Sequence, residues 1–244
     1  MTARVRGLAP GMLRRLRRRW HALTGLGRAV PGAVRWGDLR QPRPIGGGWG
    51  FERGQPVDRR YIEAFLVECS PDVAGRVLEV QSAAYTQRYG GERVTRSDVL
   101  DIDATNPRAT IVADLNDARN IPPATFDCII LTQTLQLVYD FAAALRGLEA
   151  CLAAGGVLIL TVPGITRVPT HFRWYWSFTA DSVKRMLAEA FPGAEVQVRS
   201  RGNIKTATAF LNGLASHELA AADFATDDPI YPVVLTARVR KAAR

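Results

Sequence analysis

Short apolar runs alternate with helix-like segments through most of the chain, and this alternation limits the fold more than any other feature. Ala109–Ala113 and Cys128–Thr132 are apolar at nearly every position, as expected for strands that are covered on both faces. Gly155-Gly156 separates a helix-like segment from Val157–Thr161, a common helix-to-strand connection. The alternation predicts an α/β protein with a three-layer, doubly wound, mostly parallel sheet.

Seven strands and four helices are predicted from this pattern. The strands span residues 76–80, 93–97, 109–113, 126–132, 155–161, 194–200 and 231–239. The helices span residues 58–67, 141–153 and 179–190, with a shorter one near 206–215. The connection from Asp98 to Asp114 is short, so a loop is expected there instead of a helix.

The composition is that of a protein with one substantial core. The chain has 244 residues, of which 47% are apolar, enough for one large domain. No apolar run approaches the roughly 18 residues of a membrane span, and no secretory signal is visible. Cys69, Cys128 and Cys151 form no CxxC pair, which favours buried reduced thiols in a cytoplasmic protein over metal ligands or disulfides.

The net charge of +9 belongs to the N-terminal part of the chain. Residues 1–60 contain 14 arginines and three acidic residues, whereas residues 61–244 contain 18 basic and 20 acidic residues. A nearly neutral domain argues against a nucleic-acid-binding core. We therefore expect a basic arm over residues 1–30, a Pro/Gly-rich linker over residues 31–56 and a domain over residues 57–244.

The arm has the pattern of a basic amphipathic helix. Leu13, Leu16, Trp20 and Leu23 fall on one side of such a helix, and arginines fall on the opposite side. This pattern is typical of peripheral contact with an anionic membrane, which would place the protein at the inner face of the membrane. A solvated or domain-packing helix and a transit peptide are the alternatives.

Polar side chains follow four of the predicted strands. In a doubly wound sheet, ligands bind outside the carboxyl ends of the strands. Carboxylates there suit a ligand with a ribose, a cationic amine and an adenine amino group, because they accept hydrogen bonds from all three. The alternative is that such residues only cap helices or turns. The four places are Glu79 with Gln81 and Ser82, then Asp98, Asp114, and Thr132–Gln136.

The turn after the first predicted strand lacks glycine. A nucleotide-binding turn usually needs glycine, which reaches positive φ and leaves the backbone bare. Here the turn reads Gln81-Ser82-Ala83-Ala84. Asp101 and Asp103 are expected to be solvated loop residues.

The order of these segments resembles the class I S-adenosylmethionine (SAM)-dependent methyltransferases. More closely, the chain resembles a bacterial type 11-like group that is often found beside glycosyltransferases. The segments that carry the resemblance are Val77–Val80, Val94–Asp98, Val112–Leu115, Phe126–Leu131 and Leu152–Leu160, with Arg53–Gly54, Pro56–Ile62, Tyr85–Gly90, Thr132–Gln136 and Tyr175–Thr179.

The resemblance implies a role for each matching residue. Glu79 and the turn after it, with Gln81 and Ser82, would face the methionine end of SAM. Asp98 would bind the ribose hydroxyls, and Asp114 with Leu115 would hold the adenine edge. Gln133 and Gln136 would lie near the sulfonium and the acceptor. Relatives keep a glycine at the position of Gln81, whose side chain would point toward the path of the cofactor.

An aromatic loop, residues 169–179, follows the fifth predicted strand. It is expected to lie over the mouth of the site and to bind the acceptor, with His171 as a base and Trp174 or Tyr175 as a stacking wall. The alternative is a loop packed on its own aromatic cluster, with His171 solvated.

These features predict a SAM-dependent methyltransferase that acts on a small-molecule or glycan-related acceptor, with O-methylation favoured. Two alternatives stay open because of the Gln81–Ala84 turn. One is a methyltransferase-like protein with a binding or assembly role. The other is a pocket that runs a non-methylating reaction such as a cyclisation.

Overall fold

The computed structural model describes residues 36–243, which are divided between two units at Arg43–Pro44. In the described part of the first unit, Gly37–Arg40 form a 3-10 turn. The second unit contains the sheet, and residues 44–56 of the predicted linker belong to it. The predicted arm over residues 1–30 lies outside the described residues. No described helix is long and apolar enough to cross a membrane.

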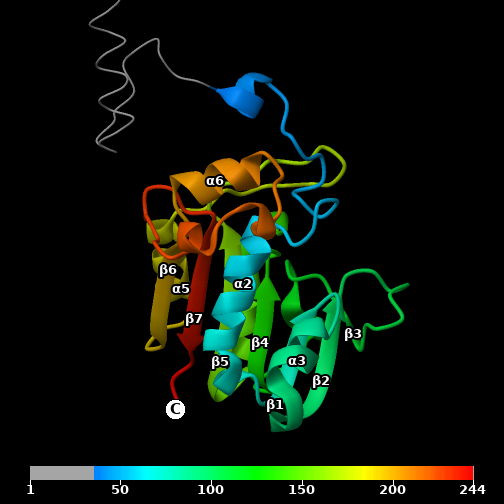
Figure 1. Cartoon of the computed structure of the whole chain (residues 1–244). Helices are drawn as coiled ribbons and strands as arrows, with labels where there is room; N and C mark the ends of the chain where they lie inside the picture. The colour runs from blue at the N-terminus through cyan, green and yellow to red at the C-terminus, as the bar shows by residue number, and fades with distance from the viewer. Residues whose placement is uncertain (1–35, 244) are drawn as a thin grey trace, which may run out of the picture. The chain divides into compact units, whose positions relative to one another are not determined.

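A seven-stranded sheet forms the centre of the second unit, in the order β3-β2-β1-β4-β5-β7-β6 (Figure 1). Strand β7 runs antiparallel to both of its neighbours, and the other pairs are parallel. The predicted fold class is therefore confirmed. The strands are β1 (Gly75–Val80), β2 (Val94–Asp101), β3 (Ile111–Val112), β4 (Phe126–Thr132), β5 (Leu152–Pro163), β6 (Glu195–Arg201) and β7 (Val234–Arg240).

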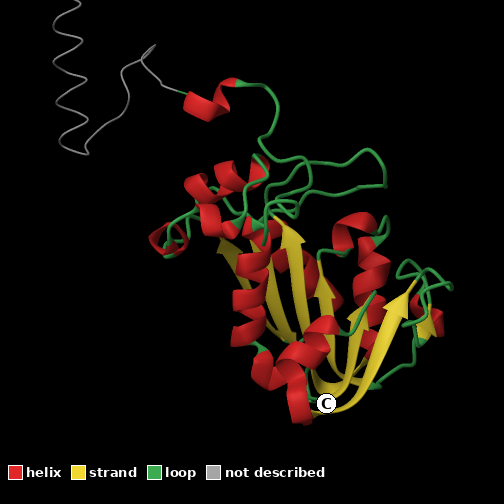
Figure 2. Cartoon of the chain, turned by 45° about the vertical axis from the view of Figure 1, so that its right-hand side comes forward, coloured by secondary structure: helices red, strands yellow, loops and turns green. Residues whose placement is uncertain are grey.

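Helices cover both faces of this sheet (Figure 2). The central strands are apolar at successive positions because neighbouring side chains point to opposite faces. In β4, Cys128 and Ile130 belong to the core under α2 and α6, whereas Ile129 and Leu131 belong to the core under α4 and α5. The helices are α2 (Val57–Glu68), α3 (Ala84–Gly90), α4 (Phe141–Cys151), α5 (Ala180–Ala190) and α6 (Ile204–Leu211).

Strand β2 is longer than the predicted 93–97. It continues to Asp101, and its residues pair in register with β1 up to Leu100 beside Val80. An aspartate is unfavourable inside a strand, so the sequence pattern suggested an end at Asp98. Arginines from β1 and β2 neutralise the charge of that aspartate, so the strand continues beyond it.

The helix-to-strand boundary near residue 152 also differs from the prediction. Helix α4 ends at Cys151, not at residue 153, and β5 begins at once with Leu152. The pairing of β4 with β5 shifts register here, and Gly155 has a φ of 76°. The glycine therefore permits an irregularity inside the strand and does not end the helix.

Helix α3 was not among the predicted helices, because its seven residues are too few to show a helical period. The connection between β2 and β3 contains no helix in the structure, as predicted. The three cysteines are buried, as predicted. Burial raises the pKa of the Cys69 thiol to about 12 and that of the Cys151 thiol to about 11.

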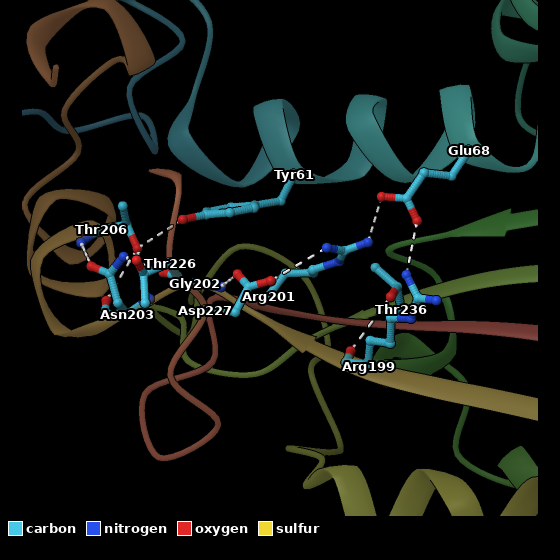
Figure 3. Close-up of polar contacts among 10 residues, drawn as sticks. All are labelled: Tyr61, Glu68, Arg199, Arg201, Gly202, Asn203, Thr206, Thr226, Asp227 and Thr236. Atoms are coloured by element: carbon cyan, nitrogen blue, oxygen red, sulfur yellow. Dashed lines mark hydrogen bonds and ion pairs between the residues drawn. The ribbon is translucent and has the colours of Figure 1, made fainter. Parts of the chain in front are cut away.

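A polar network joins α2 to the antiparallel edge of the sheet and to the last loops (Figure 3). Glu68 of α2 accepts from Arg199 and Arg201 of β6. The Asn203 side chain caps α6 by accepting from Lys205 N and Thr206 N. The Thr206 hydroxyl in turn lies 3.2 Å from the hydroxyl of Tyr61 on α2. These contacts fix α2, whose first turn reaches the site described below.

Candidate active site

A cavity of about 560 Å³ lies at the carboxyl edge of the central strands. Four successive strand ends supply its polar wall: Glu79 of β1, Asp101 of β2, Asp114 after β3, and Thr132 of β4. This volume lies within the range of about 300–1,000 Å³ of small-molecule sites. We call it the main cavity.

The turn after β1 keeps the backbone conformation of the missing glycine. Gln81 has a φ of 71°, the left-handed region that glycine favours. Its N–H donates to Leu100 O at 2.8 Å, and its carbonyl accepts from the Asn106 side chain at 3.0 Å. The Gln81 side chain is exposed at the cavity wall. The glutamine therefore preserves the path of the chain without the flexibility of glycine.

A second left-handed glutamine lies at the end of the neighbouring strand. Gln133, directly after β4, has a φ of 49° and lines the main cavity. Its N–H donates to Thr161 O at 2.9 Å. A left-handed non-glycine residue costs about 1–2 kcal/mol, and such strain gathers at functional sites.

We expect Gln81→Gly to raise the free energy of unfolding by about 0.5 kcal/mol, because relief of the left-handed strain exceeds the entropy cost of glycine. Gln81→Val should lower it by about 1 kcal/mol, since a β-branched residue fits this region poorly. Urea denaturation measures both.

Glu79 is buried and holds the start of α3. Its two carboxylate oxygens accept from Tyr85 N at 3.1 Å, from Thr86 N at 2.7 Å and from the Thr86 hydroxyl at 2.8 Å. Burial raises the pKa of Glu79 against the opposing effect of these hydrogen bonds. The hydrogen bonds of the carboxylate thus stabilise the turn that forms the cavity wall.

The structure does not bring Asp98 to the main cavity. The carboxylate lies within β2, 1% exposed, and pairs with Arg76 Nε at 2.7 Å and Arg96 Nε at 3.2 Å. Burial raises the pKa of Asp98, but Arg76, with Thr110 and Arg96, outweighs burial and lowers it. The predicted position of Asp98 at the end of its strand is wrong.

Asp101 occupies the place that was predicted for Asp98. It is the last residue of β2, is half-buried and lines the main cavity. Its oxygens accept from Asp103 N at 3.0 Å and from the Asn106 side chain at 2.7 Å, which orients the carboxylate. The prediction of a solvated loop residue is wrong for Asp101 because the strand continues to this position.

Asp114 and Leu115 line the main cavity, two and three residues after the end of β3. Asp114 is half-buried, and one of its oxygens accepts from Asn116 N at 2.9 Å and from the Asn116 side chain at 2.8 Å. Leu115 is buried. Ser82 and Gln133 also line the cavity. The structure thus brings together every predicted cofactor-binding residue except Asp98.

A smaller cavity of about 180 Å³ adjoins the main cavity, because Arg59, Gln133 and Leu137 line both. We call it the side cavity. Its polar lining residues include Asp58 and Gln136. Its aromatic lining comes from three separate parts of the chain: Trp49 and Phe51, Phe172 and Trp174, and Phe210.

Neither predicted catalytic residue lines either cavity. His171 is exposed and packs against Phe172, with ring centroids 4.6 Å apart. Tyr175 is 38% exposed and packs on Tyr139 at 5.2 Å. The aromatic loop does reach the site, however, since Phe172 and Trp174 line the side cavity and Tyr175 N donates to Gln136 O at 3.0 Å.

A bidentate ion pair holds the segment that carries Trp49 and Phe51. Arg53 binds both carboxylate oxygens of Glu218, which lies in a 3-10 turn after α6. Glu218 also accepts from Ala215 N at 2.7 Å. The Arg53 hydrogen bond and this N–H lower the pKa of Glu218 to about 2.

Glu218→Gln should change the acid stability of the protein. A lowered pKa stabilises the fold at pH values above the ordinary glutamate pKa of about 4.3. That stabilisation is lost as the pH falls through the folded pKa of about 2. We expect the free energy of unfolding to fall less steeply between about pH 4 and 2 in the variant. Urea denaturation across this pH range measures the slope, and Glu92→Gln at an exposed turn is the control.

The strand order and the edge position of the main cavity define a doubly wound α/β class of protein with a site at the carboxyl edge of its sheet. Within that class, residues 71–160 match the family model described as a methyltransferase domain. The chain has the fold of the class I SAM-dependent methyltransferases, as the sequence resemblance predicted. A search of curated proteins found no match.

Two solved structures illustrate the likeness in fold. The cyclase SpnF is 16% identical, with a TM-score of 0.54, over 96% of this chain and 95% of SpnF. A SAM-dependent methyltransferase from Archaeoglobus fulgidus is 13% identical, with a TM-score of 0.51, over 75% of this chain and 94% of that protein. At these identities the likeness concerns the fold.

Proposed function

We propose that this protein is a SAM-dependent methyltransferase that binds SAM in the main cavity and methylates an oxygen of a small-molecule or glycan-related acceptor. One observation carries the proposal: a cavity with carboxylates at adjacent strand ends adjoins a second cavity, and three residues line both. This arrangement offers one compartment for a nucleoside-containing donor and one for an acceptor.

The residues of the main cavity fit the chemistry of SAM. Arg59 is the one basic residue among those that line it and suits the methionine carboxylate. Asp101 suits the two ribose hydroxyls, and Asp114 suits the adenine amino group. Ile102, which is 69% exposed, and Leu115 offer apolar contact to the adenine ring. Glu79 contributes by holding the Gln81–Ala84 turn in place.

SAM supplies a methyl group on a positively charged sulfur, which needs little help from acids or bases. The protein contributes mainly by aligning the acceptor with the donor and by excluding water from them. Thr132 and Gln133, at the end of β4, lie where the two compartments approach each other, since Gln133 lines both.

Calorimetric titration with SAM and S-adenosylhomocysteine tests the proposal. We expect micromolar binding of both nucleosides, with one site per chain. Absence of heat at millimolar SAM, with the protein folded, would refute it.

A non-methylating reaction is the second candidate. It is favoured by the replacement of the usual glycine by Gln81 and is compatible with the likeness to the cyclase SpnF. The two candidates differ in one product: a methyltransferase releases S-adenosylhomocysteine in step with the acceptor that is consumed, whereas a cyclase binds SAM and returns it unchanged.

A further inference from the structure

We propose that the side cavity binds a neutral acceptor through a hydroxyl group on a single six-membered ring, with Asp58 as the catalytic base and Gln136 as a second acceptor of hydrogen bonds. This inference rests on the proposed function. It deepens that function by naming the class of acceptor and the residues that contact it.

Gln136 supplies the first observation. Its side chain is 2% exposed, and its Oε1 atom has no hydrogen-bond partner among the described residues. Its Nε2 donates to Gln133 O at 2.8 Å, which fixes the amide so that Oε1 is the free end. A buried acceptor without a partner costs about 1–3 kcal/mol. Gln136 lines the side cavity, and a bound hydroxyl that reaches Oε1 there would remove this cost.

Asp58 supplies the second observation. It lies in the first turn of α2 and lines the side cavity. Among the described residues, its carboxylate accepts one hydrogen bond, from Arg59 N to Oδ1 at 2.8 Å. Burial raises the pKa of Asp58 against the opposing effect of Arg59. A desolvated carboxylate with spare acceptor capacity is suited to take a proton from a bound hydroxyl.

The charges around the side cavity select a neutral ligand. Arg59 lines the cavity, and Arg167 stacks on the Trp49 ring at 4.6 Å and binds Gly47 O. These two cations disfavour a cationic amine, and Asp58 disfavours an anion. Flat aromatic walls and a volume of about 180 Å³ suit one ring, since drug-sized ligands need about 300 Å³ or more.

The proposed step balances as a simple displacement. The acceptor hydroxyl loses its proton to Asp58, and its oxygen bonds to the methyl carbon. The carbon–sulfur bond breaks, and its electron pair stays on sulfur, which leaves S-adenosylhomocysteine. Asp58 then returns the proton to water.

Ligand-observed NMR with the full chain saturated with S-adenosylhomocysteine tests the binding. The neutral probes are p-cresol and methyl α-glucoside, which distinguish a phenol from a sugar. Benzylamine and benzoate are charged probes with the same ring size as p-cresol. We expect one neutral probe to bind about tenfold more tightly than either charged probe. Gln136→Met should weaken that binding about tenfold, by loss of one hydrogen bond.

The stability of Gln136→Met separates a ligand role from a structural one. The substitution removes the unpartnered buried acceptor but also the hydrogen bond that Nε2 donates to Gln133 O. These two effects oppose each other, so the midpoint of thermal unfolding should change little. A lower midpoint with unchanged probe binding would overturn the role of Gln136. Preferred binding of benzylamine or benzoate, or binding of no probe, would overturn the acceptor class. Failure of S-adenosylhomocysteine to bind would instead overturn the proposed function.

Asp58→Asn tests the base, with the bound neutral probe as acceptor. Release of S-adenosylhomocysteine should fall at least about 100-fold, the usual contribution of a general base, while the affinity for the nucleoside is kept. The acidic limb of the pH–rate profile should disappear. Arg59 is the other charged group that lines the side cavity, and Arg167 stacks on its Trp49 wall. Asp181→Asn, in the first turn of α5, is the matched control. An unchanged rate or pH profile in Asp58→Asn would exclude Asp58 as the base.

Discussion

Replacement of Asp101 by alanine is expected to weaken S-adenosylhomocysteine binding about 100-fold. The carboxylate is held at the cavity wall by Asp103 N and Asn106. In the proposed function it accepts hydrogen bonds from two ribose hydroxyls. A hydrogen bond to a charged group contributes about 1.5 kcal/mol or more, so the loss of two amounts to about 3 kcal/mol. Calorimetric titration measures the change.

Two further variants make this prediction specific. Asp103→Ala removes an exposed carboxylate from the same loop, and the affinity should stay within about threefold. Asp98→Ala should leave the affinity unchanged but lower the free energy of unfolding by about 3 kcal/mol, because it breaks a buried ion pair. If Asp98→Ala abolished binding in the folded protein while Asp101→Ala did not, this would show that Asp98 and not Asp101 binds the ribose.

Glu79→Ala is expected to lower the free energy of unfolding by about 4 kcal/mol. The substitution leaves Tyr85 N, Thr86 N and the Thr86 hydroxyl without their acceptor. Each buried donor without a partner costs about 1–3 kcal/mol, and a typical domain is stable by only about 5–15 kcal/mol. Chemical denaturation followed by circular dichroism measures the effect.

The expected loss depends on burial, and matched variants test this. Glu79→Gln keeps one acceptor oxygen, so about half of the effect should remain. Glu189→Ala removes a glutamate whose side chain is 64% exposed and pairs with Arg185, and its effect should stay within about 0.5 kcal/mol. A loss in Glu79→Ala no larger than that in Glu189→Ala would refute the structural role of Glu79.

The sheet was predictable because its central strands carry their own signal. Residues 128–131 are apolar at successive positions since both faces of β4 are covered there. The spacing between Asp98 and Asp114 also predicted the loop that replaces a helix. Strand ends were less predictable, because pairing with neighbouring strands decides them. Val99 and Leu100 extend β2 beside Glu79 and Val80.

The position at which β2 ends decides which carboxylate lines the main cavity. With β2 ending at Asp101, the carboxylate at the cavity wall is three residues beyond the predicted one. The acidic residue within the strand is tolerated because Arg76, from the neighbouring strand, pairs with it. Such a cross-strand partner cannot be identified from the local sequence.

The sequence indicated only part of the side cavity. The aromatic loop with Trp174, and Gln136, were expected near the acceptor, whereas Asp58 was not. An aspartate at the start of a predicted helix is an ordinary first-turn residue, so Asp58 carried no functional meaning there. The other residues that line the cavity include Trp49, Trp174 and Phe210, which belong to three separate parts of the chain. His171 and Tyr175 were favoured for their chemistry, but packing turns them toward Phe172 and Tyr139.

The sequence by itself determined the α/β class, the seven-stranded sheet and the residues that follow β1, β3 and β4, because the hydrophobic period is a local property of the chain. The tertiary structure decided where β2 ends, that Gln81 adopts a glycine-like φ of 71°, and which side chains form the side cavity. These outcomes depend on pairing and burial between segments far apart in the chain, where charge neutralisation and packing outweigh local preference.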